Sequence, residues 1–164
     1  MFDKFGEMDS AKEINERAEN LLKEGDIEGL KTMAKENGIP EEYVEMYTGN
    51  AIPFLTDEIT AANGKLDLEC EELKPKGLME DWCEYIRGLT MENLDMAAAV
   101  RKKGKRLKSC MASLLAYSFA NRQQVDKEIV KEAKISAGRV DFGVPGSRDA
   151  RRLIREYYQG GAGK

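Results

Sequence analysis

The sequence predicts an all-α protein, and three observations support this fold class. Apolar residues recur at intervals of three and four along most of the chain, which is the period of one face of an α-helix. Residues that favour helix starts and helix ends separate these apolar stripes. The stripe is clearest within residues 97–118, where one face collects Val100, Gly104, Leu107, Met111, Leu114, Leu115 and Ser118. On this pattern Gly104 lies on the buried side of the helix.

Residues 1–50 are predicted to form an acidic unit of three short helices. Ser10 opens a capping box for the first helix, and Gly25 ends it. Asp26 is expected to cap the second helix. Pro40 suits the first turn of the third, because a proline lacks the N–H group that has no partner at that position.

Residues 51–77 are predicted to be a connecting helix followed by a turn. Thr56 is the expected cap, and apolar residues after it keep helical spacing. Residues 65–71 also alternate between apolar and polar, so a short strand is an alternative there, although the helix is favoured. Residues 74–77 contain both proline and glycine, which interrupt a helix, and they form either a linker or a simple turn.

Residues 78–160 are predicted to form a basic helical core. A helix carrying the single tryptophan comes first, with Thr90 expected to cap the segment that follows. Residues 91–120 form either one helix or two helices joined at Gly104. A short helix is expected to start near Asp126.

The last predicted helix follows the turn-rich residues 136–147 and is amphipathic. Its apolar side carries Ala150, Leu153, Ile154 and Tyr157, and its basic side carries Arg148, Arg151, Arg152 and Arg155. Four guanidinium groups within two turns are able to grip phosphates or a partner's carboxylates. The alternative is an ordinary surface helix with Arg–Glu pairs. Residues 161–164 are expected to be a frayed tail.

Charge divides the chain into two halves. Residues 1–82 contain 9 Lys and Arg against 21 Asp and Glu, whereas residues 83–164 contain 17 against 9. Such asymmetry is typical of proteins that bind a nucleic acid or a charged protein partner. The alternative is that the two halves neutralise each other where they pack.

Two sets of charged residues are therefore candidate binding surfaces. The basic set joins the four arginines of the last helix to Arg101, Lys102, Lys105, Arg106 and Lys108. The acidic set, which could imitate the spacing of phosphates toward a basic partner, is Glu41, Glu42, Glu45, Asp57, Glu58, Glu69, Glu71 and Glu72. Either set could instead be a solvated face, and residues 97–120 could alternatively form a helix-turn-helix.

The composition argues against an enzyme. The chain has 164 residues, enough for one domain with a real core, and it has no histidine. Ser-His-Asp and Cys-His catalysis are thereby excluded. Cys70, Cys83 and Cys110 are widely spaced and are expected to be reduced thiols, so no metal and no cofactor are predicted. No run approaches the ~18 apolar residues of a membrane span, and a cytoplasmic protein is expected.

Four passages resemble a known family. Residues Met1–Ser10 and Glu24–Ile39, followed by Ala98–Lys108 and Arg152–Tyr158, are similar to the PcfK-like, ninth-numbered type II-A anti-CRISPR family of Cas9 inhibitors from Firmicutes mobile elements. The resemblance implies a stoichiometric inhibitor that binds a Cas9 ribonucleoprotein in the host cytoplasm and blocks DNA engagement or cleavage. The resemblance does not assign a functional residue of that family to any position of this sequence.

The charge pattern is compatible with such an inhibitor. Cas9-type effectors hold the guide–target duplex in positively charged channels, which an acidic helical unit is able to occupy. The basic half would then contact guide RNA or target DNA. The alternative is a nucleic-acid-binding accessory protein of a conjugative element or phage, and the oligomeric state stays open.

Overall fold

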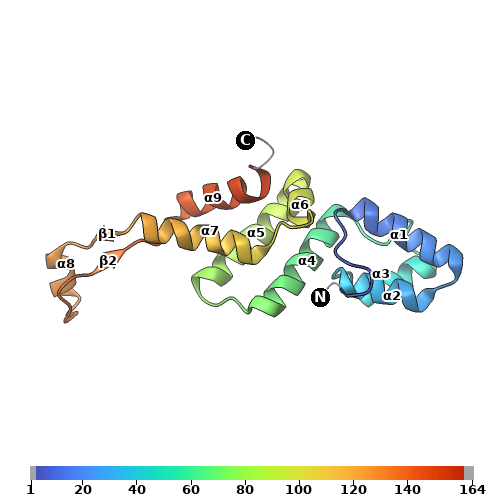
Figure 1. The fold of residues 1–164 in the computed structure, drawn as a ribbon, viewed down its shortest axis with the longest axis horizontal. Coiled ribbons are helices and arrows are strands. Elements are labelled where there is room, and N and C mark those ends of the chain that lie inside the picture. Colours follow the sequence, from blue (N-terminus) through green and yellow to red (C-terminus); the bar gives the residue numbers. More distant parts are fainter. Residues whose placement is uncertain (1–2, 161–164) are drawn as a thin grey trace. The chain divides into compact units, whose positions relative to one another are not determined.

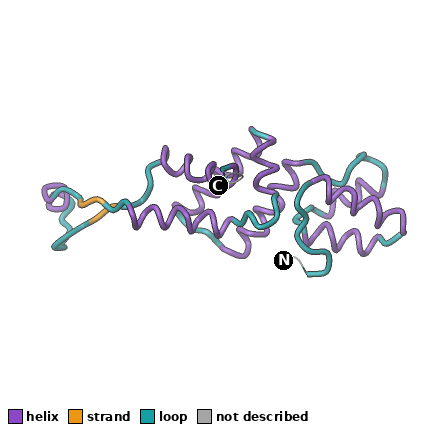
Figure 2. Tube along the Cα trace, turned by 45° about the horizontal axis from the view of Figure 1, so that its top comes forward, coloured by secondary structure: helices purple, strands orange, loops and turns teal. Residues whose placement is uncertain are grey.

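The computed structural model describes residues 3–160, which form two compact units and are predominantly helical (Figure 1). The first unit runs to Lys108 and the second starts at Ser109. The predicted all-α class is confirmed, and Figure 2 shows how little of the chain is strand. Charge differs between the units: the sequence up to Lys108 has 16 Lys and Arg against 24 Asp and Glu, and the remainder has 10 against 6.

Six helices build the first unit: α1 (Ala11–Glu24), α2 (Ile27–Glu36), α3 (Glu41–Thr48), α4 (Glu58–Leu73), α5 (Leu78–Glu92) and α6 (Leu94–Arg101). Helix α2 packs against α1 and α3, while α4 packs against α5 and α6. The boundary between units therefore lies after the basic stretch rather than at residues 74–77, because α5 and α6 bury their apolar faces against α4.

The three predicted N-terminal helices are confirmed. The Ser10 hydroxyl accepts a hydrogen bond from the Glu13 amide at 3.1 Å, as in a capping box. Gly25 ends α1 with a left-handed backbone at φ +74°, and the Asp26 carboxylate then accepts from the Gly29 amide at 2.8 Å. The apolar faces of these helices meet in one buried cluster that includes Ile14 and Leu30.

Helix α4 departs from the prediction at its start. Its cap is Asp57, whose carboxylate accepts from the Thr60 amide at 2.7 Å. Thr56 is not the cap: its hydroxyl donates to the Asp57 carbonyl at 3.2 Å, and its amide and carbonyl are bonded to the Asn15 side chain. Residues 65–71 lie within α4, so the alternative of a strand there is excluded.

Two glycines allow α4 to approach the turn after α2. A Cβ atom on Gly64 would lie 2.2 Å from the Gly38 carbonyl oxygen, and a Cβ on Gly38 would lie 2.2 Å from that of Gly64. Gly38 also has φ +77°, a conformation that side chains rarely adopt. The close contact of these two backbones explains why both positions are glycine.

Residues 91–120 contain two breaks. Helix α5 ends at Glu92, and the side chain of Asn93, rather than Thr90, caps α6 by accepting from the Met96 amide at 2.9 Å. A turn then precedes α7 (Leu107–Ala120). Gly104 lies in that turn, exposed and with φ +81°, so the prediction that it occupies the buried face of a helix is wrong. Two helices, α6 and α7, are joined by the turn at Gly104, as the alternative prediction stated.

The second unit contains most of α7, β1 (Gln123–Gln124), α8 (Lys127–Glu132), β2 (Asp141–Phe142) and α9 (Ser147–Gln159). The two short strands pair antiparallel, with Gln124 opposite Asp141, and the Val125 amide donates to the Val140 carbonyl at 2.8 Å. This ribbon carries an arm, residues 125–140, that contains α8. The predicted frayed tail at 161–164 lies outside the described residues.

Candidate functional site

Arg101 is a structural residue and not part of an exposed basic surface. Its side chain is 1% exposed at the end of α6. Its Nε donates to the Met8 carbonyl at 3.0 Å, and its Nη1 donates to the carbonyls of Asn37 and Ala61 at 3.0 and 3.2 Å. Burial lowers its pKa to about 10, and the guanidinium stays charged at neutral pH. The predicted role of Arg101 on a basic surface is therefore corrected.

Asn37 completes the contacts of Arg101. Its Oδ1 accepts from the Arg101 Nη2 and from the Met8 amide, the latter at 3.1 Å. Its Nδ2 donates to the carbonyls of Gly6 and Met33. Through these two side chains, the N-terminal segment, the end of α2, α4 and α6 become one hydrogen-bonded assembly.

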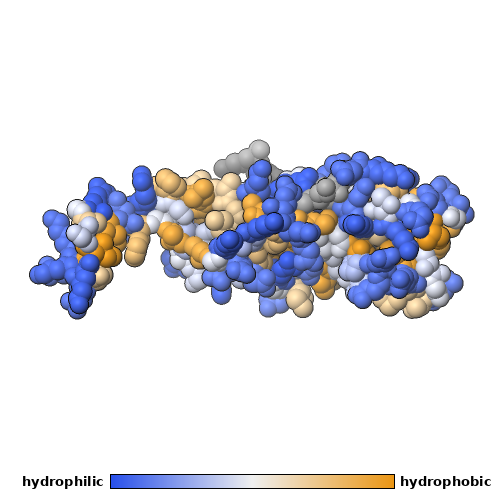
Figure 3. All heavy atoms as spheres, turned by 90° about the horizontal axis from the view of Figure 1, so that it is seen from below, coloured by the Kyte–Doolittle hydropathy of each residue, from blue (hydrophilic) through white to orange (hydrophobic). Residues whose placement is uncertain are grey.

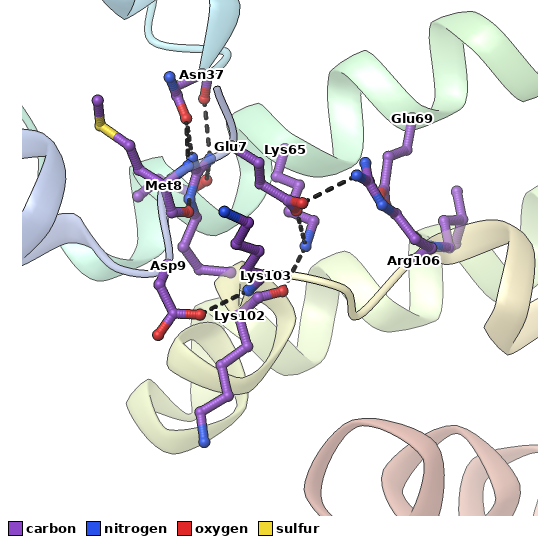
Figure 4. A network of polar contacts seen from close by, with 12 residues as sticks. Glu7, Met8, Asp9, Asn37, Lys65, Glu69, Lys102, Lys103 and Arg106 are labelled. Carbon is purple, nitrogen blue, oxygen red and sulfur yellow. Dashed lines mark hydrogen bonds and ion pairs between the residues drawn. The ribbon is translucent and has the colours of Figure 1, made fainter. Parts of the chain in front are cut away.

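A second buried cluster holds four charged side chains (Figure 4). Glu7 pairs with Lys65 at 2.8 Å and with Arg106 at 2.9 Å. Arg106 lies 3.8 Å from Glu69, whose other carboxylate oxygen accepts from the Leu107 amide at 3.0 Å. Glu69 is 6% exposed, so it is not available on an acidic surface, and Arg106 is partly covered by the same cluster. The prediction that placed Glu69 on an exposed surface is corrected, whereas the side chain of Arg106 remains 41% exposed.

Burial shifts two pKa values in this cluster. Desolvation raises the pKa of Glu69, against the opposing effects of the Leu107 amide and nearby cations. Desolvation lowers the pKa of Lys65, although the carboxylate of Glu7 opposes that change. Both shifts favour the neutral forms, because separating a charge from water is costly even when a partner is present.

The other members of the predicted basic set between residues 101 and 108 are Lys102, Lys105 and Lys108. Lys102 and Lys108 are exposed, and Lys105 is half-buried. The backbone of this turn is fixed from within, because the Lys65 ammonium donates to the Lys102 carbonyl at 2.7 Å and the Lys103 amide donates to Asp9 at 2.8 Å. Lys102 and Lys103 therefore face solvent from a turn whose backbone is fixed, and Lys108 faces solvent from the start of α7.

The four arginines of α9 are all exposed, as the pattern predicted. The opposite face buries Ala150, Ile154 and Tyr158, whereas Leu153 and Tyr157 are only half-buried. Arg152 pairs with Glu156 at 3.1 Å and with Asp149 at 3.4 Å. Arg152 and Glu156 are both exposed and Asp149 is half-buried, so these pairs contribute little to stability and compete weakly with an incoming anion.

Seven of the eight acidic candidates are exposed, and all seven lie in the first unit. They are Glu41, Glu42, Glu45, Asp57, Glu58, Glu71 and Glu72. Two of them also make contacts within the protein: Glu41 pairs with Lys31 at 3.1 Å, and Asp57 caps α4. The structure thus places these carboxylates on α3, on α4 and at the cap of α4 rather than on a flexible tail.

Sequence patterns missed a pair of interacting thiols. Cys70 of α4 and Cys83 of α5 are hydrogen-bonded to each other, and this bond is the main reason why the pKa of Cys70 falls to about 7. The same bond and burial raise the pKa of Cys83. Cys83 lies 13 positions after Cys70 in the sequence, and the packing of α4 on α5 brings the two side chains together.

Comparison with protein-family models, curated proteins and solved structures found no match to this chain. Among residues 3–160, no three Cys, Asp or Glu side chains are grouped so as to hold a metal ion. None of the helices in that range combines the length and the apolar character needed to traverse a bilayer.

Proposed function

We propose that this protein inhibits a Cas9-type CRISPR effector by stoichiometric binding in the cytoplasm of a bacterial host. Binding blocks engagement or cleavage of DNA and involves no catalysis by the inhibitor. The family resemblance of four passages supports the proposal. The structural observation that carries it is the set of seven exposed carboxylates on the folded first unit.

The physical argument is charge complementarity. Cas9-type effectors bind their nucleic acids in positively charged channels. A folded unit with an excess of eight acidic over basic residues is attracted to such a channel, and its charges compete with phosphates for the same cations. Because the carboxylates lie on helices, little conformational entropy is lost when they bind.

A titration tests the proposal directly. Guide-loaded type II-A Cas9 proteins would be incubated with increasing amounts of the full chain before a labelled target duplex is added. We expect cleavage to be lost near one inhibitor per effector, and the two proteins to co-elute in gel filtration. Inhibition at far lower ratios would indicate turnover, and the absence of both inhibition and co-elution would reject the proposal.

The exposed arginines of α9 favour a second candidate, a nucleic-acid-binding accessory protein of a conjugative element or phage. The arm adds a basic group that sequence patterns did not single out: Lys127, Lys131, Lys134 and Arg139 line one open groove. On this hypothesis, affinity for DNA or RNA falls steeply with salt. Replacing Arg148, Arg151, Arg152 and Arg155 with alanine should weaken binding to all sequences alike, and unchanged affinity would reject that surface.

A further inference from the structure

An open groove of about 950 Å³ lies in the first unit between α1, the loop after α3 and the start of α4. Its wall on the loop side is fixed by Asn15 of α1, whose Nδ2 donates to the Thr56 carbonyl at 2.8 Å and whose Oδ1 accepts from the Thr56 amide at 3.0 Å. Leu55 is fully buried beside it. The groove is therefore formed before any partner arrives, which lowers the cost of binding.

The groove combines an apolar surface with an acidic rim. Phe54 is 65% exposed although the next residue is buried, and Ile52 and Tyr47 line the same hollow. Exposed aromatic side chains in a concave site are typical anchors for a partner. In Figure 3, apolar atoms around α1–α3 emerge as small patches between hydrophilic atoms.

The rim carries a net negative charge. Glu16 and Glu19 lie on α1, Asp57 and Glu58 lie at the start of α4, and Lys12 is the one cation among the lining residues. Glu16 pairs with Lys12 at 3.7 Å and Glu19 pairs with Lys23, which is not a lining residue; all four side chains are well exposed, so these attractions are weak. The four carboxylates would repel an anionic ligand. A cationic ligand would be attracted by the carboxylates of α1 on one side and by those at the start of α4 on the other.

We propose that this groove docks a cationic segment of a partner protein, with an apolar side chain of that segment seated against Phe54. The groove is wide and open, which suits a polypeptide. Nucleic acid is disfavoured by the rim charge. The proposal rests on the proposed function only in naming the Cas9-type effector as the source of the segment.

A peptide-binding experiment tests the groove without the effector. The probe is a fluorescein-labelled hexapeptide that alternates arginine with leucine, and binding to the full chain is followed by fluorescence anisotropy. We expect Glu16→Lys with Glu19→Lys to weaken binding about tenfold, and Phe54→Ser about fivefold. The matched control, Glu71→Lys with Glu72→Lys, changes charge equally on exposed positions of α4 outside the groove and should leave affinity within about twofold.

Three outcomes would overturn the inference. Equal affinity of all variants would show that the peptide binds elsewhere, and an equal loss in the control would show attraction to overall charge alone. A dimer that dissociates in Glu16→Lys with Glu19→Lys, without peptide binding, would assign the groove to a second copy of the chain. Sedimentation velocity distinguishes that case, and circular dichroism checks that each variant folds.

The same variants separate this inference from the proposed function. If the effector binds wild type and Glu16→Lys with Glu19→Lys equally well, the groove is not the docking site, while inhibition stands. If the peptide binds in the groove but no effector is inhibited, the docking site stands and its natural partner is another cationic protein.

Discussion

The two units use arginine in opposite ways. In the first unit, Arg101 is buried and donates to three backbone carbonyls, and Arg106 joins a buried cluster of carboxylates. In the second unit, the four arginines of α9 are exposed, and Arg152 pairs with the exposed Glu156 and the half-buried Asp149 of its own helix. Similar runs of positive charge thus stabilise a fold in one place and form a surface in the other.

This comparison teaches that charge density in a sequence does not locate a binding surface. A buried guanidinium is tolerated because its planar fork meets fixed acceptors on several segments. An exposed guanidinium contributes little to the free energy of unfolding and stays available to a partner. Measurements of stability should therefore separate the two groups of arginines.

The largest expected effect is that of Arg101→Ala. The substitution leaves the carbonyls of Met8, Asn37 and Ala61 buried without their donor, and we expect the free energy of unfolding to fall by about 3–5 kcal/mol. Urea unfolding followed by the fluorescence of Trp82, which lies in the first unit, measures it. Arg155→Ala should change stability by less than about 0.5 kcal/mol, and equal effects would contradict the comparison.

A smaller loss is expected from Gly64→Ala. The new methyl group would lie 2.2 Å from the Gly38 carbonyl oxygen, so the backbone must shift, at a cost of about 2 kcal/mol. Gly88 of α5 is the matched control, since a Cβ there meets nothing within 4 Å. We expect Gly88→Ala to stabilise the first unit by about 0.5–1 kcal/mol, because alanine favours helix more than glycine does. Two losses of similar size would argue against the close contact.

The buried cluster should give the first unit a distinct pH dependence. Burial raises the pKa of Glu69 in the folded state, so the folded chain holds this proton more tightly than the unfolded chain does. The contribution of Glu69 to the free energy of unfolding is therefore greatest below the ordinary glutamate pKa and falls as pH rises through the raised pKa. In Glu69→Gln that slope should disappear from urea midpoints measured between pH 4 and 7, whereas Glu71→Gln should retain it.

The smallest change concerns thiol reactivity and not stability. Because the hydrogen bond with Cys83 lowers the pKa of Cys70 to about 7, a larger fraction of its thiol is ionised at neutral pH than in an ordinary cysteine. We expect iodoacetamide to alkylate Cys70 first, at a rate that rises through pH 7, and Cys83→Ala to slow that reaction by removing the hydrogen bond. Peptide mass spectrometry measures the rates. Faster labelling of the buried Cys110 would contradict the assignment.

Local signals predicted most of the helices because the relevant partners are a few residues apart. The caps at Ser10, Asp26 and Asp126 each bind an amide two or three positions later, and the apolar stripes reflect the helical period. Where two neighbours compete, the choice depends on distant contacts. Thr56 precedes Asp57, and the bonds of the Thr56 backbone to Asn15, 41 residues away, hold Thr56 outside the helix that Asp57 caps.

The candidate surfaces were less predictable for the same reason. Arg101 stands in a run of exposed lysines, and its acceptors on Met8 and Asn37 lie 93 and 64 residues away. Nothing within a helical turn of Arg101 or Glu69 reveals that these two side chains are buried. The arginines of α9 could be predicted because their exposure follows from the apolar face of a single helix.

The hydrogen bonds of Arg101 also bear on the order in which the chain acquires its structure during synthesis. The ribosome makes helices α1–α3 first, but the donor that joins Met8, Asn37 and Ala61 is the last residue of α6. The N-terminal helices consequently cannot form these hydrogen bonds until residue 101 has been synthesised. A chain cut at Gly77 would retain α1–α4 but lack that donor, so it would be a poor candidate for an autonomous fragment.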